Sequence, residues 1–151
     1  MPDGGGSNRE EHRPDVAKLY VRNDAPFVAR DRVREVQSRL QDAGVEVTVD
    51  HWGRRIPWDD AREAHDAFET FAEWAASEGV SLEPAFQRSC HTSHYTGEAV
   101  EVLVPPVVTL VAYDRDESQP LAVYPHRDGK RQVSVEDGLK QLEQPRSIRP
   151  A

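Results

Sequence analysis

Apolar positions near the start of the chain change from the period of a strand to that of a helix. Residues 16–21 are rich in β-formers, and Asn23 and Asp24 follow as turn residues and a helix N-cap signal. Apolar residues then recur at helical spacing up to Gly44, at Val33, Val36, Leu40 and Ala43. Pro26 suits the first helical turn, because the N–H that it lacks would be unpaired there. This part of the chain predicts strand, tight turn and helix.

The same kind of pattern predicts the later elements. Residues 45–52 alternate as in a half-buried strand, and an apolar stripe over residues 57–79 indicates a second helix. Residues 99–104 and 107–113 read as strands, 121–124 as a short return strand, and 134–143 as a last helix with Ser134 as N-cap. Residues 80–98 are polar and rich in histidine, and their pattern leaves strand and loop equally open.

The order strand, helix, strand, helix, hairpin, helix predicts an α/β fold with a mixed sheet and helices on both faces. Residues 19–28, LYVRNDAPFV, resemble the opening of glutaredoxin and thioredoxin-like proteins, in which Cys-Pro-Tyr-Cys begins a long helix. Ala25 and Val28 stand in place of both cysteines, so a redox dithiol is absent. The resemblance implies the thioredoxin-like βαβαββα fold and a cis proline before the third strand, at Pro105 or Pro106. A ferredoxin-like βαββαβ fold would need a hairpin where Pro57 and a helix stand.

Length and composition set the organisation and the environment. We expect disordered tails at residues 1–14 and 145–151 around a single thioredoxin-like domain at 15–144. The formal charge is −8, with three lysines against sixteen arginines, which favours a halophile over a merely GC-rich genome. The single cysteine, Cys90, excludes an internal disulfide, and no apolar run would span a membrane, so we expect a cytoplasmic protein.

The whole chain also resembles a family of small proteins from halophilic archaea. The resemblance lies in Trp52-Gly53, in residues 81–84 (SLEP), in residues 96–98 (TGE) and in Pro105-Pro106-Val107. Members of that family often carry a helix-turn-helix label, which implies DNA binding. A DNA-reading pair needs two helices joined by a short turn and a basic or amide-rich second helix. Here a strand separates the two candidate helices, and the second is acidic.

One polar cluster brings potential metal donors together. Cys90, His91 and His94 lie within five residues, and His51 is a further donor. Structural zinc usually takes well-spaced pairs of ligands, so these residues are weak metal candidates and we predict neither metal nor cofactor. A catalytic cysteine–histidine pair from the same residues is the enzyme alternative.

The predicted binding surface lies where the first two strands end. Ligands of open α/β sheets bind at that edge. There we expect Arg22, Arg54 and Trp52, the turn Ala25-Pro26-Phe27-Val28, and Pro105 or Pro106. The sequence favours a non-redox binding or scaffold module over an enzyme, with another protein as partner and the oligomeric state left open. The alternative is a DNA-binding regulator, although the acidic charge argues against a broad nucleic-acid footprint.

Overall fold

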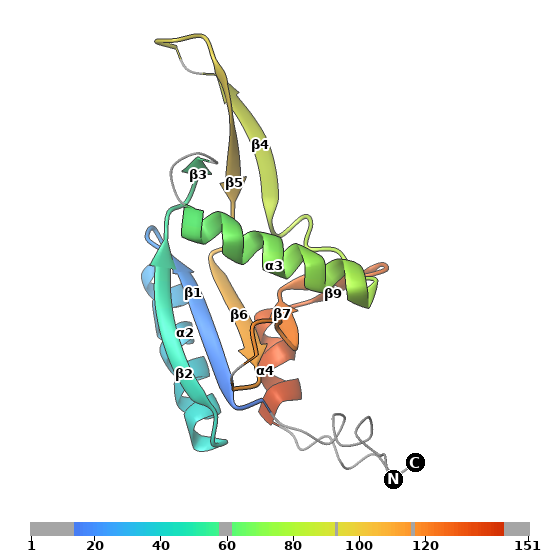
Figure 1. Ribbon diagram of the computed structural model, residues 1–151. Helices are drawn as coiled ribbons and strands as arrows, with labels where there is room; N and C mark the ends of the chain where they lie inside the picture. The colour runs from blue at the N-terminus through green and yellow to red at the C-terminus, as the bar shows by residue number, and fades with distance from the viewer. Residues whose placement is uncertain (1–13, 58–61, 93, 116, 144–151) are drawn as a thin grey trace.

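The computed structural model describes residues 14–57, 62–92, 94–115 and 117–143. Its elements, in chain order, are β1 (Val16–Arg22), α2 (Phe27–Asp42), β2 (Glu46–Trp52), β3 (Ile56–Pro57), α3 (Arg62–Glu78), β4 (Gln87–Thr92), β5 (Ala99–Val104), β6 (Val108–Tyr113), β7 (Ala122–Tyr124), β8 (His126–Asp128), β9 (Arg131–Val133) and α4 (Val135–Glu143) (Figure 1). The tails predicted at residues 1–14 and 145–151 lie outside the described residues, apart from Pro14.

The central sheet has the strand order β2-β1-β6-β7. β1 and β2 are parallel, as expected for two strands joined through the crossover helix α2, while β6 runs antiparallel to both of its neighbours. β1 and β6 consist mostly of buried side chains, whereas the side chains of β2 are mostly exposed or half-buried, in keeping with the central position of β1 and β6. The predicted α/β fold with a mixed sheet is confirmed, and the elements that build the sheet and its cover follow the predicted βαβαββα order.

Helices cover both faces of this sheet and create two separate cores. α2 and α4 bury Val33, Val36, Leu40, Leu139 and Leu142 against one face, to which β1, β6 and β7 contribute side chains. α3 covers the other face with aromatic residues, and Phe71 lies at the centre of that core with no exposed surface. The helical spacing of apolar residues in the sequence predicts both buried stripes.

Residues 80–98 contain a strand that the sequence pattern leaves undecided. β4 pairs antiparallel with β5, and β5 pairs in turn with the short strand β3, so these strands form a second sheet in the order β3-β5-β4. Figure 1 shows the β4–β5 hairpin extending well away from the central sheet. The polar sequence of β4 carries no alternation of its own, and its strand conformation comes from pairing with β5.

The expected cis proline before the third strand is wrong. The cis peptide bonds of the described residues precede Pro84 and Pro125, and those preceding Pro105 and Pro106 are trans. The trans chain brings the carbonyl oxygens of Pro105 and Val107 to Arg22, whose side chain and backbone N–H donate to them at 3.1 and 3.0 Å. These bonds continue the β1–β6 pairing to the end of β1.

The start of α2 also differs from the expected geometry. α2 begins at Phe27, with Pro26 as an extended N-cap residue rather than in the first helical turn. No side chain caps this end, so the turn residues Asn23 and Asp24 do not serve as the expected N-cap. At the other end Gly44 adopts φ 87°, the left-handed conformation that ends helices.

Candidate functional site

Arg22 ties the ends of several elements together. Its guanidinium donates to both carboxylate oxygens of Asp24, at 2.9 and 3.0 Å, and to the carbonyl of Pro105 at 3.1 Å. The hydrogen bond from Arg22 is the main cause of the lowered pKa of Asp24. Only 18% of the Arg22 side chain is exposed. Arg22 therefore links the turn to the segment before β6, and each of its three side-chain nitrogens donates a hydrogen bond within the protein.

The turn that follows presents apolar side chains to solvent. Phe27 and Val28 are 71% and 74% exposed, whereas Ala25 is buried beneath them. Pro105 is also buried and Pro106 is half-buried. Pro26 is exposed as well, so Pro26, Phe27 and Val28 form the accessible part of the predicted apolar contact residues in this region.

Trp52 lies in the aromatic core and does not line a surface. Its ring is 7% exposed, stacks on Tyr20 at 4.6 Å and meets Phe86 edge-on at 6.5 Å. The strand alternation places Trp52 on the face covered by α3, which explains its burial. Arg54, two residues further on, is exposed and helps to lower the pKa of the Asp24 carboxyl.

A cationic groove lies between α2 and β2, at the edge of the central sheet. It has a volume of about 350 Å³ and is lined by Val21, Arg30, Val33, Arg34, Gln37, Val49 and His51. None of these lining residues carries a carboxylate. Arg34 forms an ion pair with Asp31 at 3.5 Å. Both side chains are exposed, and exposed ion pairs of this kind contribute little to the stability of the fold. Sequence reasoning missed this groove, although Arg30, Arg34 and Gln37 recur at the spacing of one helix face.

The candidate metal donors come from two sheets and from a connecting segment. Cys90 and His91 belong to β4, and the exposed Cys90 is a free thiol. His94 follows in the β4–β5 connection, whereas His51 lies on β2 in the other sheet. Within the described part of the chain, no group of three or more His, Cys, Asp or Glu residues is placed to hold a metal ion.

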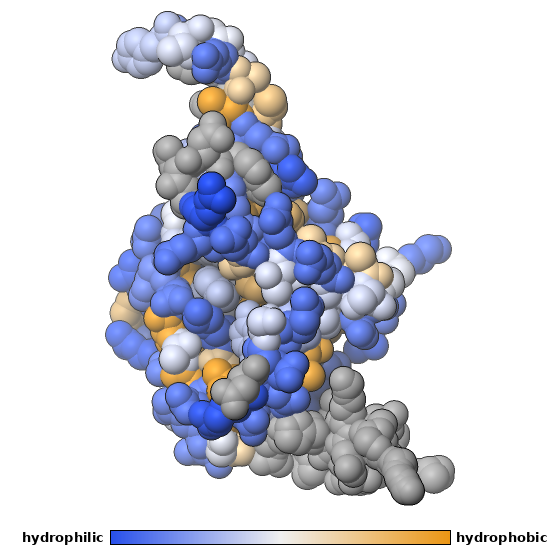
Figure 2. All heavy atoms as spheres, in the orientation of Figure 1, coloured by the Kyte–Doolittle hydropathy of each residue, from blue (hydrophilic) through white to orange (hydrophobic). Residues whose placement is uncertain are grey.

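A helix-turn-helix pair is not found among the helices that the structure describes. β2 and β3 lie between α2 and α3, and no two of the described helices follow one another through a short turn. The outer side of α3 carries exposed carboxylates at Glu63, Asp66, Glu69, Glu73 and Glu78. The face seen in Figure 2, over which α3 runs, is mostly hydrophilic. This acidic helix is unsuited to phosphate contacts.

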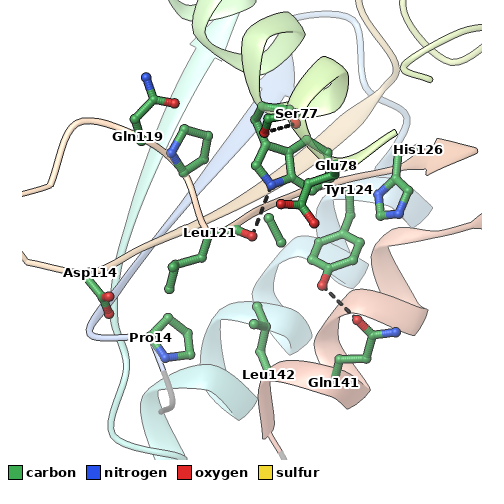
Figure 3. Close-up of a pocket in the computed structure, with 13 residues that line it drawn as sticks. Pro14, Ser77, Glu78, Asp114, Gln119, Leu121, Tyr124, His126, Gln141 and Leu142 are labelled. Carbon is green, nitrogen blue, oxygen red and sulfur yellow. Dashed lines mark hydrogen bonds between the residues drawn. The ribbon is translucent and has the colours of Figure 1, made fainter. Parts of the chain in front are cut away.

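A larger pocket of about 520 Å³ lies at the other end of the molecule, between α3, β7 and α4 (Figure 3). Trp74 Nε1 donates to the Leu121 carbonyl at 3.1 Å, and the Tyr124 hydroxyl donates to Gln141 Oε1 at 2.8 Å. The lining includes Glu78 and Asp114 but neither arginine nor lysine. The pocket is therefore no receptor for phosphate. The sequence does not reveal it, because its walls come from segments far apart in the chain.

The chain belongs to a family described as a helix-turn-helix domain, since the family model matches residues 9–147. No curated protein matches the chain, and no solved structure matches it either. In the described residues no helix combines the length and the apolar character needed to cross a membrane.

Proposed function

We propose that the protein is a DNA-binding regulator that contacts DNA through α2 and the adjoining edge of β2. Membership of the helix-turn-helix family supports DNA binding as the class of function. The acidic α3 and the absence of a helix pair among the described residues direct the contact to another element. α2 is the element whose surface chemistry suits phosphate.

The observation that carries this proposal is the charge of the α2–β2 groove. Along α2, four arginines face three carboxylates, whereas α3 has one arginine against five carboxylates. Arg30, Arg34 and His51 line the groove, and no acidic residue lines it with them. A small cationic groove of this kind provides a local phosphate contact on an otherwise acidic protein.

In such a complex the arginines of the groove would bind DNA phosphates, and so set the affinity for DNA and the position of the protein on it. A guanidinium binds phosphate oxygens with two parallel hydrogen bonds, while contacts to base edges carry the sequence information. Gln37, one turn after Arg34 on α2, also lines the groove and has the amide that pairs well with adenine.

The test is binding of a labelled 30-base-pair duplex, followed by fluorescence anisotropy over a series of salt concentrations. Arg30→Glu together with Arg34→Glu is expected to weaken binding about tenfold or more. It should also reduce the slope of log affinity against log salt by about 2. Arg127→Glu with Arg131→Glu is the matched control, because it reverses two exposed arginines on the β8–β9 hairpin. Equal effects of both double variants, or no binding by the wild type, would rule out the α2 surface.

A second candidate function is a protein-binding module, favoured by the exposed pair Phe27 and Val28. The strand order β2-β1-β6-β7 and the βαβαββα succession support a thioredoxin-like fold for such a module. Changing Phe27 and Val28 to serine removes this apolar surface without altering charge. The variant should keep its DNA affinity under the first proposal and lose a bound protein under the second.

The cellular setting is part of the same proposal. The single cysteine supports a cytoplasmic location. The charge of −8, with few lysines and many arginines, supports a salt-rich cytoplasm.

A further inference from the structure

β2 is the long open edge of the central sheet. It has seven residues, pairs with β1 at every one of them and has no second strand neighbour in the described structure. Neither proline nor an interruption of the register blunts this edge. Figure 1 shows β2 along the outer side of the sheet. Such an edge offers unpaired backbone N–H and C=O groups to another strand.

The hydrogen bonds at both ends of β2 show which backbone groups point outward. Glu46 N–H donates to Asp15 at 3.0 Å, and the Trp52 carbonyl accepts from Asn23 at 2.8 Å, so both residues face β1. Successive residues of a strand point their backbone N–H and C=O groups to opposite sides. The backbone groups of Val47, Val49 and His51 therefore point to the open edge, away from β1.

We propose that β2 pairs antiparallel with β2 of a second copy of this chain, with Val49 opposite Val49. In this register Val47 lies opposite His51 of the other copy, and each outward residue both donates and accepts a hydrogen bond. Thr48 lies opposite Asp50, so no two carboxylates oppose one another. The two central sheets then form one continuous sheet across the interface.

Neighbouring registers are less favourable. Centring the pair on Thr48 places Glu46 opposite Asp50 twice, and centring it on Asp50 places the two Asp50 carboxylates opposite each other. Like charges directly opposite on a sheet are destabilising. Both shifts also leave one of the three outward residues in each copy without a partner. Charge and hydrogen bonding therefore select the same register.

The other edges of the two sheets are less suited to this pairing. β7 has only three residues. β4 has six, but its described side chains are exposed, and pairing there would bury little apolar surface. β2 carries the half-buried Val47 and Val49, which pack with the aliphatic core. A second copy would cover these two valines as well as the backbone edge.

The consequence for DNA binding rests on the proposed function. Val49 and His51 share the groove with α2, so the pairing brings the grooves of both copies together on one face. Arg30 and Arg34 of each copy then form one cationic surface. Their mutual repulsion opposes dimerisation, so salt or a bound polyanion should favour the dimer.

The test is register-specific disulfide formation without DNA, in a Cys90→Ser background. A hydrogen-bonded antiparallel pair places its Cα atoms about 5.5 Å apart, within the range of a disulfide. Val49→Cys is therefore expected to give a covalent dimer on mild oxidation. Thr48→Cys should not give a covalent dimer, because the two copies of residue 48 are diagonal neighbours in this register, about 7 Å or more apart. Crosslinking at position 48 and not at 49, or at neither, overturns the proposal.

A second measurement separates folding from association. Proline is tolerated where an edge-strand N–H faces solvent, so Val49→Pro should keep the circular dichroism spectrum and be monomeric by sedimentation. Val49→Thr keeps the N–H and should remain a dimer. A monomeric wild type at high salt, or a dimeric Val49→Pro, also overturns the proposal. Because no DNA is present, loss of DNA binding and loss of the dimer are observed separately.

Discussion

The two faces of the central sheet are packed by different means. The face under α3 is filled by large rings, among them Tyr20, Phe71 and Phe86, which contact one another edge-on. The face under α2 and α4 is mainly aliphatic, with the ring of Tyr124 under α4. Ion pairs between Arg39 and Glu143 and between Arg32 and Glu136 join the two helices.

This difference separates stability from surface chemistry. The rings beneath α3 bury a large apolar area per residue. The inner side of α3 therefore supplies the packing, and the outer side carries exposed carboxylates. α2 contributes smaller side chains to its core, and its arginines lie either against α4 or along the groove beside β2. The aromatic core under α3 and the proposed binding surface on α2 thus lie on opposite sides of the central sheet.

The largest expected effect comes from removing the central ring of the α3 face. Phe71 is fully buried, at 5.7 Å from Tyr20 and 6.1 Å from Phe86 between ring centroids. Phe71→Ala should lower the free energy of unfolding by about 3–5 kcal/mol. Urea denaturation measures this loss, and Val33→Ala on the opposite face should cost less. Equal losses would remove the distinction between the two cores.

A smaller effect is expected where α4 comes close to the sheet. Gly138 lies against the ring of Tyr124, and a Cβ at this position would overlap that ring. Gly138→Ala should therefore lower the free energy of unfolding by about 1–3 kcal/mol, although alanine favours the helix. Lys140→Ala, on the exposed side of the same helix, is the control for thermal denaturation. A more stable Gly138→Ala variant would show that α4 can move away from the sheet.

The smallest effect concerns the cap of α4. Ser134 N–H and Oγ both donate to Asp137 at 3.0 Å, and these bonds lower the pKa of Asp137. Stabilisation is thus present above the usual pKa of an aspartate and is lost as the pH falls through the lower, folded-state pKa. Asp137→Asn should melt slightly below the wild type at pH 7, with the difference fading in acid. A difference that persists at pH 2 would contradict this linkage.

Much of the fold is predictable from local sequence. The helical spacing in α2, the alternation in β2 and β5, and the apolar run of β6 each correspond to an observed element. The capping pair Ser134 and Asp137 marks the start of α4 correctly. Pro57, where the sequence predicts the second helix to begin, lies in β3 instead, because Ile56 and Pro57 pair with β5, and residues 58–61 lie outside the described residues. β4 escaped prediction because a polar strand acquires its structure from its partner.

The site is less predictable than the fold. The hydrogen bonds from Arg22 to Asp24 and Pro105 cannot be predicted from the sequence, and neither can the burial of Trp52 in the aromatic core. Both outcomes depend on contacts between segments distant in the chain. Phe27 and Val28, in contrast, stay exposed because a helix N-terminus at the end of a sheet has nothing above it in the described structure.

The two prolines between β5 and β6 have a consequence for how the chain can change over evolutionary time. Pro105 and Pro106 have no N–H, so neither can donate a ladder hydrogen bond where the hairpin joins the central sheet. Pairs of residues can therefore be added to or removed from the β4–β5 hairpin without shifting the register of β6 against β1. We expect relatives to differ in the length of this hairpin while the central sheet keeps its dimensions.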